Sequence, residues 1–207
     1  MENTLRETGG IEAVLFDFGG VLSEEGFRNG LKAIARLNGI DEENFVRAAN
    51  DAVHTCGYVT GKVPESAYWD ILRKTAGIRG DDQHLRNEIL SRFRMREWMI
   101  DIVKRLKMRN VCVGILSDQT NWLDELDSRL DFFTLFDYVF NSFHLGKSKN
   151  DPSLFMDVLN VMGLSPHETL FIDDTIGHVL RARSNGLHAI HYKGKEPFLI
   201  EMKRFCP

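Results

Sequence analysis

Apolar residues gather in short unbroken runs near the start of the chain and again after residue 110. The first run, at 13–16, leads directly into Asp17 and then to Gly19 and Gly20. A run this short and continuous indicates a strand buried on both faces. Similar runs lie at 111–116, 138–140, 169–172 and 188–191. The pattern therefore predicts five buried strands.

Between 23 and 93 the apolar positions recur with helical spacing instead, as at Phe27, Leu31 and Ile34. Further helices are predicted there at 41–49, 64–76 and 81–93, without any strand. Beyond this stretch, helices predicted near 98–109, 122–126 and 152–162, and one before Asn185, alternate with the strands. Alternating strands and helices predict an α/β fold with a parallel sheet covered on both faces.

The helical stretch interrupts that alternation after the first strand. It is too long for an ordinary connection between two elements. We therefore expect a core domain built from residues 1–22 and 94–207, and a small inserted helical domain over 23–93.

Polar side chains follow several of the predicted strands at the point where each strand ends. Asp17, Ser117 and the pair Asp173 and Asp174 occupy such positions, and Lys149 lies in a loop that leaves another strand. Because parallel strands bring their carboxyl ends to one edge of a sheet, we expect these groups to converge.

Carboxylates forced together repel one another, and a hard dication such as Mg²⁺ removes that repulsion with oxygen ligands. A lysine and a serine hydroxyl beside that cation would make an anion site, most simply for phosphate. Asp17 could then serve both as a metal ligand and as a nucleophile. The glycine turn after Asp17 offers backbone N–H groups to developing negative charge.

Four segments resemble the four motifs of the haloacid dehalogenase-like (HAD) superfamily. The motifs are an apolar strand followed by DxDGT/V, a strand ending in Ser or Thr, a lysine in GxxKPDP, and a strand ending in DD. The matching segments are Val14-Leu15-Phe16-Asp17-Phe18-Gly19-Gly20-Val21, Gly114-Ile115-Leu116-Ser117, Gly146-Lys147-Ser148-Lys149-Asn150-Asp151-Pro152 and Leu170-Phe171-Ile172-Asp173-Asp174. The resemblance covers nearly the whole chain.

This resemblance implies a Rossmann-like three-layer core with a parallel sheet and a C1-type helical cap over the site. It implies a Mg²⁺-dependent phosphohydrolase for a small phosphorylated metabolite, acting through an aspartyl-phosphate on Asp17. Asp17 and the Gly19 carbonyl would bind Mg²⁺. Asp174 would be the main carboxylate ligand of the fourth motif, and Asp173 would ligate directly or through water.

The same resemblance implies which groups hold the phosphate. Ser117 and Lys149 would do so, helped by the backbone N–H groups of Phe18 and Asp118, and Lys149 would also offset the charge near the nucleophile. Such caps place specificity residues in the loop that here contains His54, Cys56 and Tyr58. Ordinary loop or packing roles are the alternative for those three residues.

Some positions depart from the family pattern. Gly19 stands where phosphatases of the family usually carry a second Asp, the general acid and base, whose help is worth roughly 10²–10⁴-fold in rate. A non-catalytic protein that binds phosphate or a partner is therefore one alternative, and a metal-independent haloacid dehalogenase is another. The acidic pair at 173–174 favours the metal-dependent branch. His178 replaces the Asn of the DDxxxN pattern, which we expect to loosen the surroundings of Asp174.

The composition adds limits on partners and location. The net charge of −4 provides no basic footprint for nucleic acid, and no apolar window reaches the roughly 18–20 residues of a membrane span. Cys56, Cys112 and Cys206 are odd in number and widely spaced, which fits reduced thiols. The first ten residues lack the apolar core of a signal peptide. We expect a cytoplasmic protein, with monomer and homodimer both open.

Overall fold

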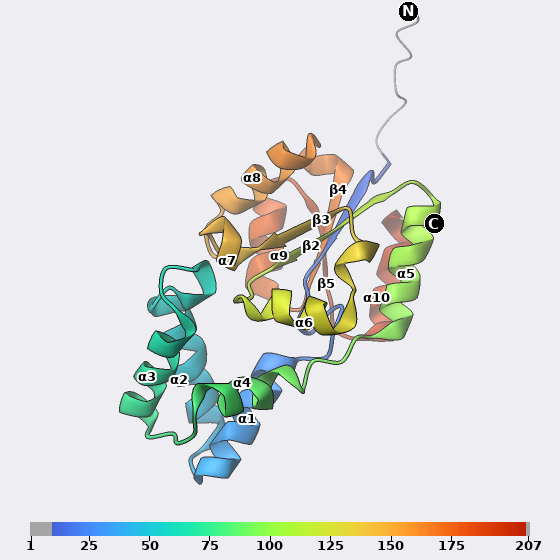
Figure 1. Cartoon of the computed structure of the whole chain (residues 1–207). Helices are drawn as coiled ribbons and strands as arrows, with labels where there is room; N and C mark the ends of the chain where they lie inside the picture. Colours follow the sequence, from blue (N-terminus) through green and yellow to red (C-terminus); the bar gives the residue numbers. More distant parts are fainter. Residues whose placement is uncertain (1–9, 206–207) are drawn as a thin grey trace, which may run out of the picture.

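A computed structural model describes residues 10–205, so the polar N-terminal segment before Gly10 and Cys206 lie outside the described part. Within it, five strands form one parallel sheet in the order β3-β2-β1-β4-β5 (Figure 1). The strands are β1 (Ala13–Phe16), β2 (Cys112–Ser117), β3 (Tyr138–Asn141), β4 (Thr169–Asp173) and β5 (His188–His191). Each lies within one residue of its predicted bounds, which confirms the α/β prediction.

Helices cover both faces of this sheet. Successive residues of a strand point to opposite sides, and because these strands carry apolar residues on both sides, both faces must be buried. Val14 and Phe16 join a core cluster with the buried faces of α5 (Glu97–Met108) and α10 (Lys195–Phe205). Leu15 joins a second cluster with α8 (Ser153–Met162) and α9 (Ile176–Ser184) on the other side (Figure 1). The core is therefore three-layered, as predicted.

Two further helices of the core follow strand ends. They are α6 (Trp122–Leu130), which was predicted, and the one-turn α7 (Ser142–Leu145), which was not. Four residues are too few to display a helical period, which explains the omission of α7. Helix α10 was not predicted either, and its segment carries Pro197 in its first turn.

The insert between β1 and β2 is helical, and we call its helices the cap. They are α1 (Gly26–Asn38), α2 (Glu42–Thr55), α3 (Glu65–Ala76) and α4 (Asp82–Leu90), with a 3₁₀ turn at Tyr58–Thr60. The predicted extension of α4 to residue 93 is wrong. The chain turns after Leu90 because Phe93 packs against Phe18 of the core, with ring centroids 5.6 Å apart.

The two connections between core and cap run side by side. An isolated antiparallel bridge joins Ser23 to Met95, and the Glu24 amide donates to the Arg94 carbonyl over 2.9 Å. The predicted domain boundaries, at 22/23 and 93/94, fall within this pair of connections and stay a prediction.

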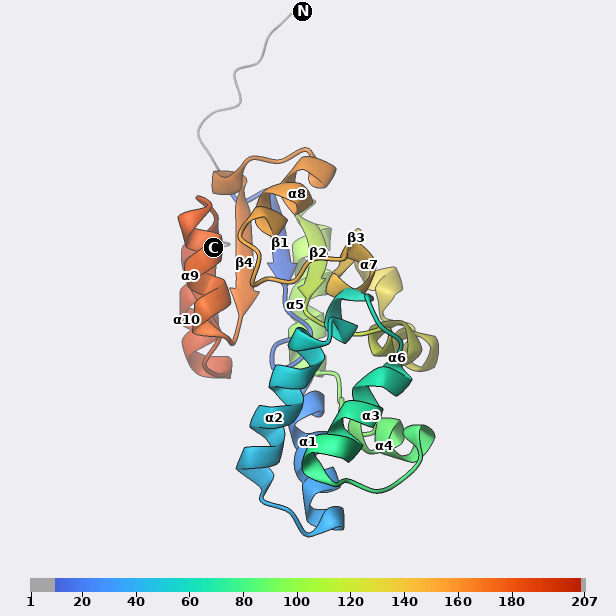
Figure 2. The ribbon, with the colours of Figure 1, turned by 90° about the vertical axis from the view of Figure 1, so that its left-hand side faces the viewer.

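The cap is also docked on the core at a second place, through its 3₁₀ turn. The Tyr58 hydroxyl donates to the Asn121 side chain over 2.7 Å, and the Ser142 hydroxyl donates to the Val59 carbonyl over 2.7 Å. Gly61 passes so close to Phe143 that a Cβ there would lie 2.5 Å from the Phe143 carbonyl oxygen. Figure 2 shows the cap helices beyond the arrowheads of the strands, over the edge where the strands end.

From residue 10 to residue 205, we find no helix with the length and apolar character that crossing a bilayer requires.

Candidate active site

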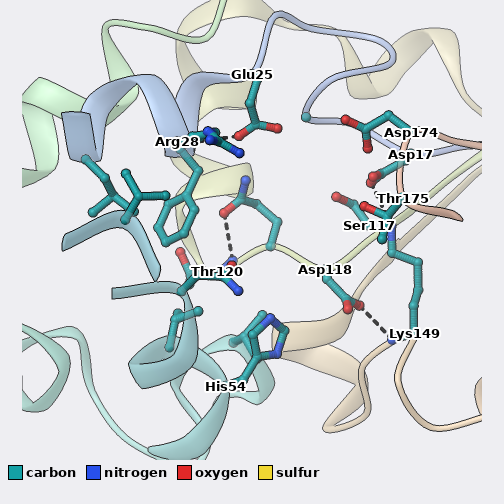
Figure 3. Close-up of a pocket in the computed structure, with 18 of the residues that line it drawn as sticks. Asp17, Glu25, Arg28, His54, Ser117, Asp118, Thr120, Lys149, Asp174 and Thr175 are labelled. Atoms are coloured by element: carbon teal, nitrogen blue, oxygen red, sulfur yellow. Dashed lines mark hydrogen bonds and ion pairs between the residues drawn. The ribbon is translucent and has the colours of Figure 1, made fainter. Parts of the chain in front are cut away.

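The structure brings the predicted strand-end residues together under the cap. A cavity of about 680 Å³ opens there, and Asp17, Ser117, Lys149 and Asp174 are among the residues that line it (Figure 3). Asp17 follows β1 directly, and its amide donates to the Ile172 carbonyl of neighbouring β4 over 2.8 Å. The sheet edge thus sets the position of the carboxylates through backbone pairing.

Lys149 is the buried cation of the site, with 1% of its surface exposed. Its ammonium lies 2.9 Å from Asp17 Oδ1 and 2.6 Å from Asp173 Oδ2. Burial opposes this charge, but the carboxylates of Asp17 and Asp173 outweigh it and raise the pKa of Lys149. The Lys149 amide also donates to Asp118 Oδ1 over 2.8 Å, which anchors the loop. The lysine is therefore a fixed cation between two carboxylates.

Three carboxylates gather at this point. One oxygen each of Asp17, Asp173 and Asp174 lies within 4.8 Å of the others. Burial and the neighbouring carboxylates raise the pKa of Asp17 and of Asp174, against the opposing charge of Lys149. Hard oxygen donors crowded in this way fit a divalent cation such as Mg²⁺, which would relieve their repulsion. The carboxylate cluster is thus a candidate metal site.

The two aspartates of the fourth motif have different surroundings. Asp173 accepts hydrogen bonds on both oxygens, from Lys149, from the Thr175 amide at 2.7 Å and from the His178 ring at 3.1 Å. Burial alone would raise the pKa of Asp173, but Lys149 and His178 lower it to about 2. Asp174 is less buried and lines the cavity. The contacts therefore leave Asp174 as the more accessible carboxylate of the pair.

His178 lies against Asp173. Its Nδ1 is 3.1 Å from Asp173 Oδ2 and its Nε2 lies 4.0 Å from Asp118 Oδ2. The expected loosening around Asp174 stays a prediction. Helix α9 begins just after Thr175, and its first turn brings the His178 side chain back over the end of β4. Spacing alone could not tell which aspartate it would meet.

Gly20 proves to be more than a turn residue. Its φ is +81°, and a Cβ there would lie 2.8 Å from Asp174 Cγ and closer still to Oδ2. Its carbonyl accepts a hydrogen bond from Arg96, which also pairs with Glu24. The missing side chain therefore leaves room for the Asp174 carboxylate.

The predicted phosphate-binding groups lie on the same edge. Ser117 is buried at the end of β2 beside the cavity. The Phe18 amide, however, donates to Asp17 Oδ1 over 2.7 Å. Asp118 has one buried oxygen, Oδ2, that finds no hydrogen-bond partner within residues 10–205. The phosphate-binding roles of these residues stay predictions.

The three cap residues singled out in the sequence divide into two groups. His54 lines the cavity, and burial lowers the pKa of its ring. Tyr58 is fully buried and stacks on Tyr68, while Cys56 packs against the hydrophobic core, and neither is among the lining residues. His54 belongs to the end of α2 rather than to the expected loop, and it reaches the cavity, whereas Cys56 and Tyr58 serve in packing.

Sequence reasoning missed other residues that line the cavity. Glu25 and Arg28 come from the start of α1, and Arg47 and Asn50 come from α2. Burial raises the pKa of Glu25, and the charge of Asp174 adds to that rise. None of these residues belongs to a motif, so only the path of the cap helices places them here.

Residues 11–186 match the family described as haloacid dehalogenase-like hydrolase. The match covers more than half of the 207 residues, and the chain therefore belongs to this hydrolase family. The resemblance drawn from the four motifs is thereby confirmed.

Individual relatives agree with this assignment. The sesquiterpene phosphatase astK of Aspergillus oryzae is 25% identical over 205 residues, which are 93% of this chain and 95% of that protein. The bifunctional epoxide hydrolase 2 of Sus scrofa is 24% identical over 94% of this chain. The chain spans only between 13% and 38% of the length of three curated relatives that it matches, the porcine enzyme among them.

The fold is also shared with solved structures. A HAD family enzyme from Bacteroides thetaiotaomicron, in complex with magnesium and inorganic phosphate, superposes with a TM-score of 0.72 at 22% identity. The overlap covers 92% of this chain and 99% of that one. The similarity extends over both the core and the cap.

Proposed function

We propose that this protein is a Mg²⁺-dependent phosphohydrolase that forms an aspartyl-phosphate on Asp17 and acts on a small phosphorylated metabolite. One observation carries the proposal. The Asp17 carboxylate lines the cavity at the end of β1, 2.9 Å from the buried Lys149 ammonium and within 4.8 Å of the carboxylates of Asp173 and Asp174. A sesquiterpene phosphatase among the relatives and a neighbour complexed with magnesium and phosphate support it.

Asp17 is the nucleophile in this proposal, and the Lys149 ammonium favours the ionised form that attack on phosphorus requires. Desolvation raises the pKa of Asp17, and the charge of the buried Lys149 ammonium offsets part of that rise. Ser117 and the amides that follow the strand ends bind the phosphoryl oxygens. Asp17 and Ser117 are buried, and hydrogen bonds to developing charge are stronger among buried groups than in water.

Asp17, the Gly19 carbonyl and Asp174 would hold Mg²⁺. The bound ion would supply positive charge against the phosphoryl oxygens and between the carboxylates. The contacts of Asp173 with Lys149 favour the water-mediated role for that residue, because both of its oxygens already accept hydrogen bonds. Asp173 then acts by orienting the lysine.

Hydrolysis of p-nitrophenyl phosphate, with and without Mg²⁺, tests the proposal. We expect metal-dependent release of p-nitrophenol, which Asp17→Asn abolishes. Asp101→Asn is the matched control, because Asp101 is an exposed aspartate on α5 that does not line the cavity. Activity that survives Asp17→Asn, or that needs no metal, would refute the mechanism. A panel of sugar, nucleotide and cofactor phosphates then identifies the substrate class.

The same assays separate the alternatives. Metal-independent halide release from a 2-haloacid would indicate a dehalogenase. Mg²⁺-dependent binding of phosphate compounds without turnover would indicate a non-catalytic protein, the reading that Gly19 suggests. A cytoplasmic location and the absence of nucleic-acid and membrane partners remain part of the proposal, on the composition alone.

A further inference from the structure

A phosphohydrolase of this kind needs a group that carries a proton to the leaving oxygen and takes one from the attacking water. Gly19 lacks a side chain at the position where the resemblance places that group. The question is which side chain of the folded protein reaches the space that Gly19 leaves empty.

The surroundings of Gly19 answer this question. Among the described residues, and apart from its chain neighbours, only two side chains have an atom within 4 Å of the position that a Gly19 Cβ would occupy. One is Phe93, which cannot transfer a proton, with Cε1 at 3.6 Å. The other is Glu25, with Oε2 at 3.7 Å. A carboxylate from six residues further along the chain therefore reaches the space of the missing one.

The local structure holds Glu25 in this place. It precedes the first residue of α1, and its Oε1 accepts a hydrogen bond from the Arg28 amide over 3.0 Å. That bond fixes the carboxyl group while Oε2 is the oxygen nearest to Gly19. The next residue is Gly26, where a Cβ would collide with the Phe93 ring, so the chain can pass closely under that ring.

Glu25 also faces the reacting groups across the cavity. It lines the same cavity as Asp17 and Asp174, and Figure 3 shows its carboxylate directed into this space on the side of Asp174. The two histidines that line the cavity differ in their placement. His178 is committed to Asp173, and His54 stands on the cap side at the end of α2.

We infer that Glu25 is the general acid and base that replaces the missing aspartate. This inference rests on the proposed aspartyl-phosphate mechanism. In the first step, Asp17 bonds to phosphorus as the bond to the leaving oxygen breaks, and the Glu25 carboxyl gives that oxygen its proton. In the second step, the Glu25 carboxylate takes a proton from water, whose oxygen bonds to phosphorus as the bond to Asp17 breaks. Phosphate leaves, and both side chains return to their starting forms.

Leaving-group dependence tests this role directly. In Glu25→Gln the amide oxygen can still accept from the Arg28 amide, so the start of α1 is preserved. We expect kcat/KM for an alkyl phosphate to fall by roughly 10²–10⁴-fold, the usual value of general acid catalysis. For p-nitrophenyl phosphate, whose leaving group needs no proton, kcat/KM should fall by less than about tenfold. A burst of p-nitrophenol, one per enzyme molecule, should precede a slow steady state, because water attack lacks its base.

A matched control and a rescue complete the experiment. Glu24→Gln changes the adjacent exposed glutamate, which pairs with Arg96 outside the cavity, and should leave both substrates unaffected. Gly19→Asp should restore at least tenfold of the lost alkyl phosphatase activity in Glu25→Ala. Position 19 has room for that change, because its φ is not left-handed and its Cβ contacts are ordinary.

The outcomes separate this inference from the function on which it rests. Equal losses on both substrates in Glu25→Gln, no loss at all, or failure of the Gly19→Asp rescue would overturn the role of Glu25. Activity that survives Asp17→Asn would instead overturn the aspartyl-phosphate mechanism, whatever Glu25→Gln does.

Discussion

Gly20 and its neighbour Gly19 make a matched pair for testing how the site is packed. At Gly20, φ is +81° and an added Cβ would lie 2.8 Å from Asp174 Cγ. A left-handed backbone costs a residue other than glycine about 1–2 kcal/mol. Overpacking a well-filled site costs typically about 1–3 kcal/mol more. We therefore expect Gly20→Ala to lower the free energy of unfolding by at least about 2 kcal/mol.

Gly19→Ala is the control. Apart from its chain neighbours, the described part of the chain brings no atom closer than 3.6 Å to its Cβ, and its φ is not left-handed. A compatible Gly to Ala change is neutral or stabilises a protein by about 0.4–1 kcal/mol, through the unfolded chain. Urea denaturation in the presence of EDTA measures both variants without any contribution from metal binding. The two substitutions are at neighbouring positions, yet we expect Gly20→Ala to lower the free energy of unfolding and Gly19→Ala to leave it unchanged or raise it.

The collision itself can be isolated by a double-mutant cycle with Asp174→Ala. Removing the carboxylate removes the atoms that the new Cβ would meet, but it leaves the left-handed backbone unchanged. We expect Gly20→Ala to be less destabilising in the Asp174→Ala background, by about 1–3 kcal/mol. An equal loss in both backgrounds would refute the argument that Gly20 makes room for Asp174. A neutral Gly20→Ala would refute the backbone argument as well.

Three further predictions concern the charges. Lys149→Met should lower the free energy of unfolding by about 3–5 kcal/mol in urea denaturation, since it leaves buried carboxylates uncompensated, and adding Asp173→Asn should recover part of this loss. Mg²⁺ should raise the Tm of the wild type in calorimetry but have much less effect on Asp174→Asn, and EDTA should reverse the rise. Burial would raise the pKa of Asp137, but Lys107 and the Val113 backbone amide outweigh it and lower that pKa. The ionised Asp137 side chain therefore stabilises the fold above the ordinary aspartate pKa, and this stabilisation is lost as pH falls through the pKa of the folded state. Urea denaturation should therefore show Asp137→Asn to be less stable than the wild type at pH 7, by a margin that shrinks below about pH 4.

The sheet and its edge were predictable because their signals are local in the chain. A run such as 13–16 has no polar position, so it can only be buried on both faces, and a parallel sheet then aligns the strand ends. Asp17 follows β1 directly, and Ser117 and Asp173 are the last residues of β2 and β4, so the strand positions carry all three to one edge. The helices of the cap were likewise visible in their apolar spacing, although the end of α4 was not.

The contacts that fill the site were not predictable in the same way. His178 meets Asp173 rather than Asp174 because of how α9 starts, and Tyr58 turns into the packing between cap and core. The position of Glu25 depends on the return of the chain at Met95, some 70 residues later. No local pattern encodes a distance between segments that far apart.

The sequence by itself therefore determined the family, the α/β core, the helical insert and the convergence of Asp17, Lys149 and the acidic pair, because each follows from residues adjacent in the chain. Only the tertiary structure decided which side chain enters the space beside Gly19 and why Gly20 must lack one. Both answers are distances between groups on different elements, and such distances exist only once the whole chain has folded.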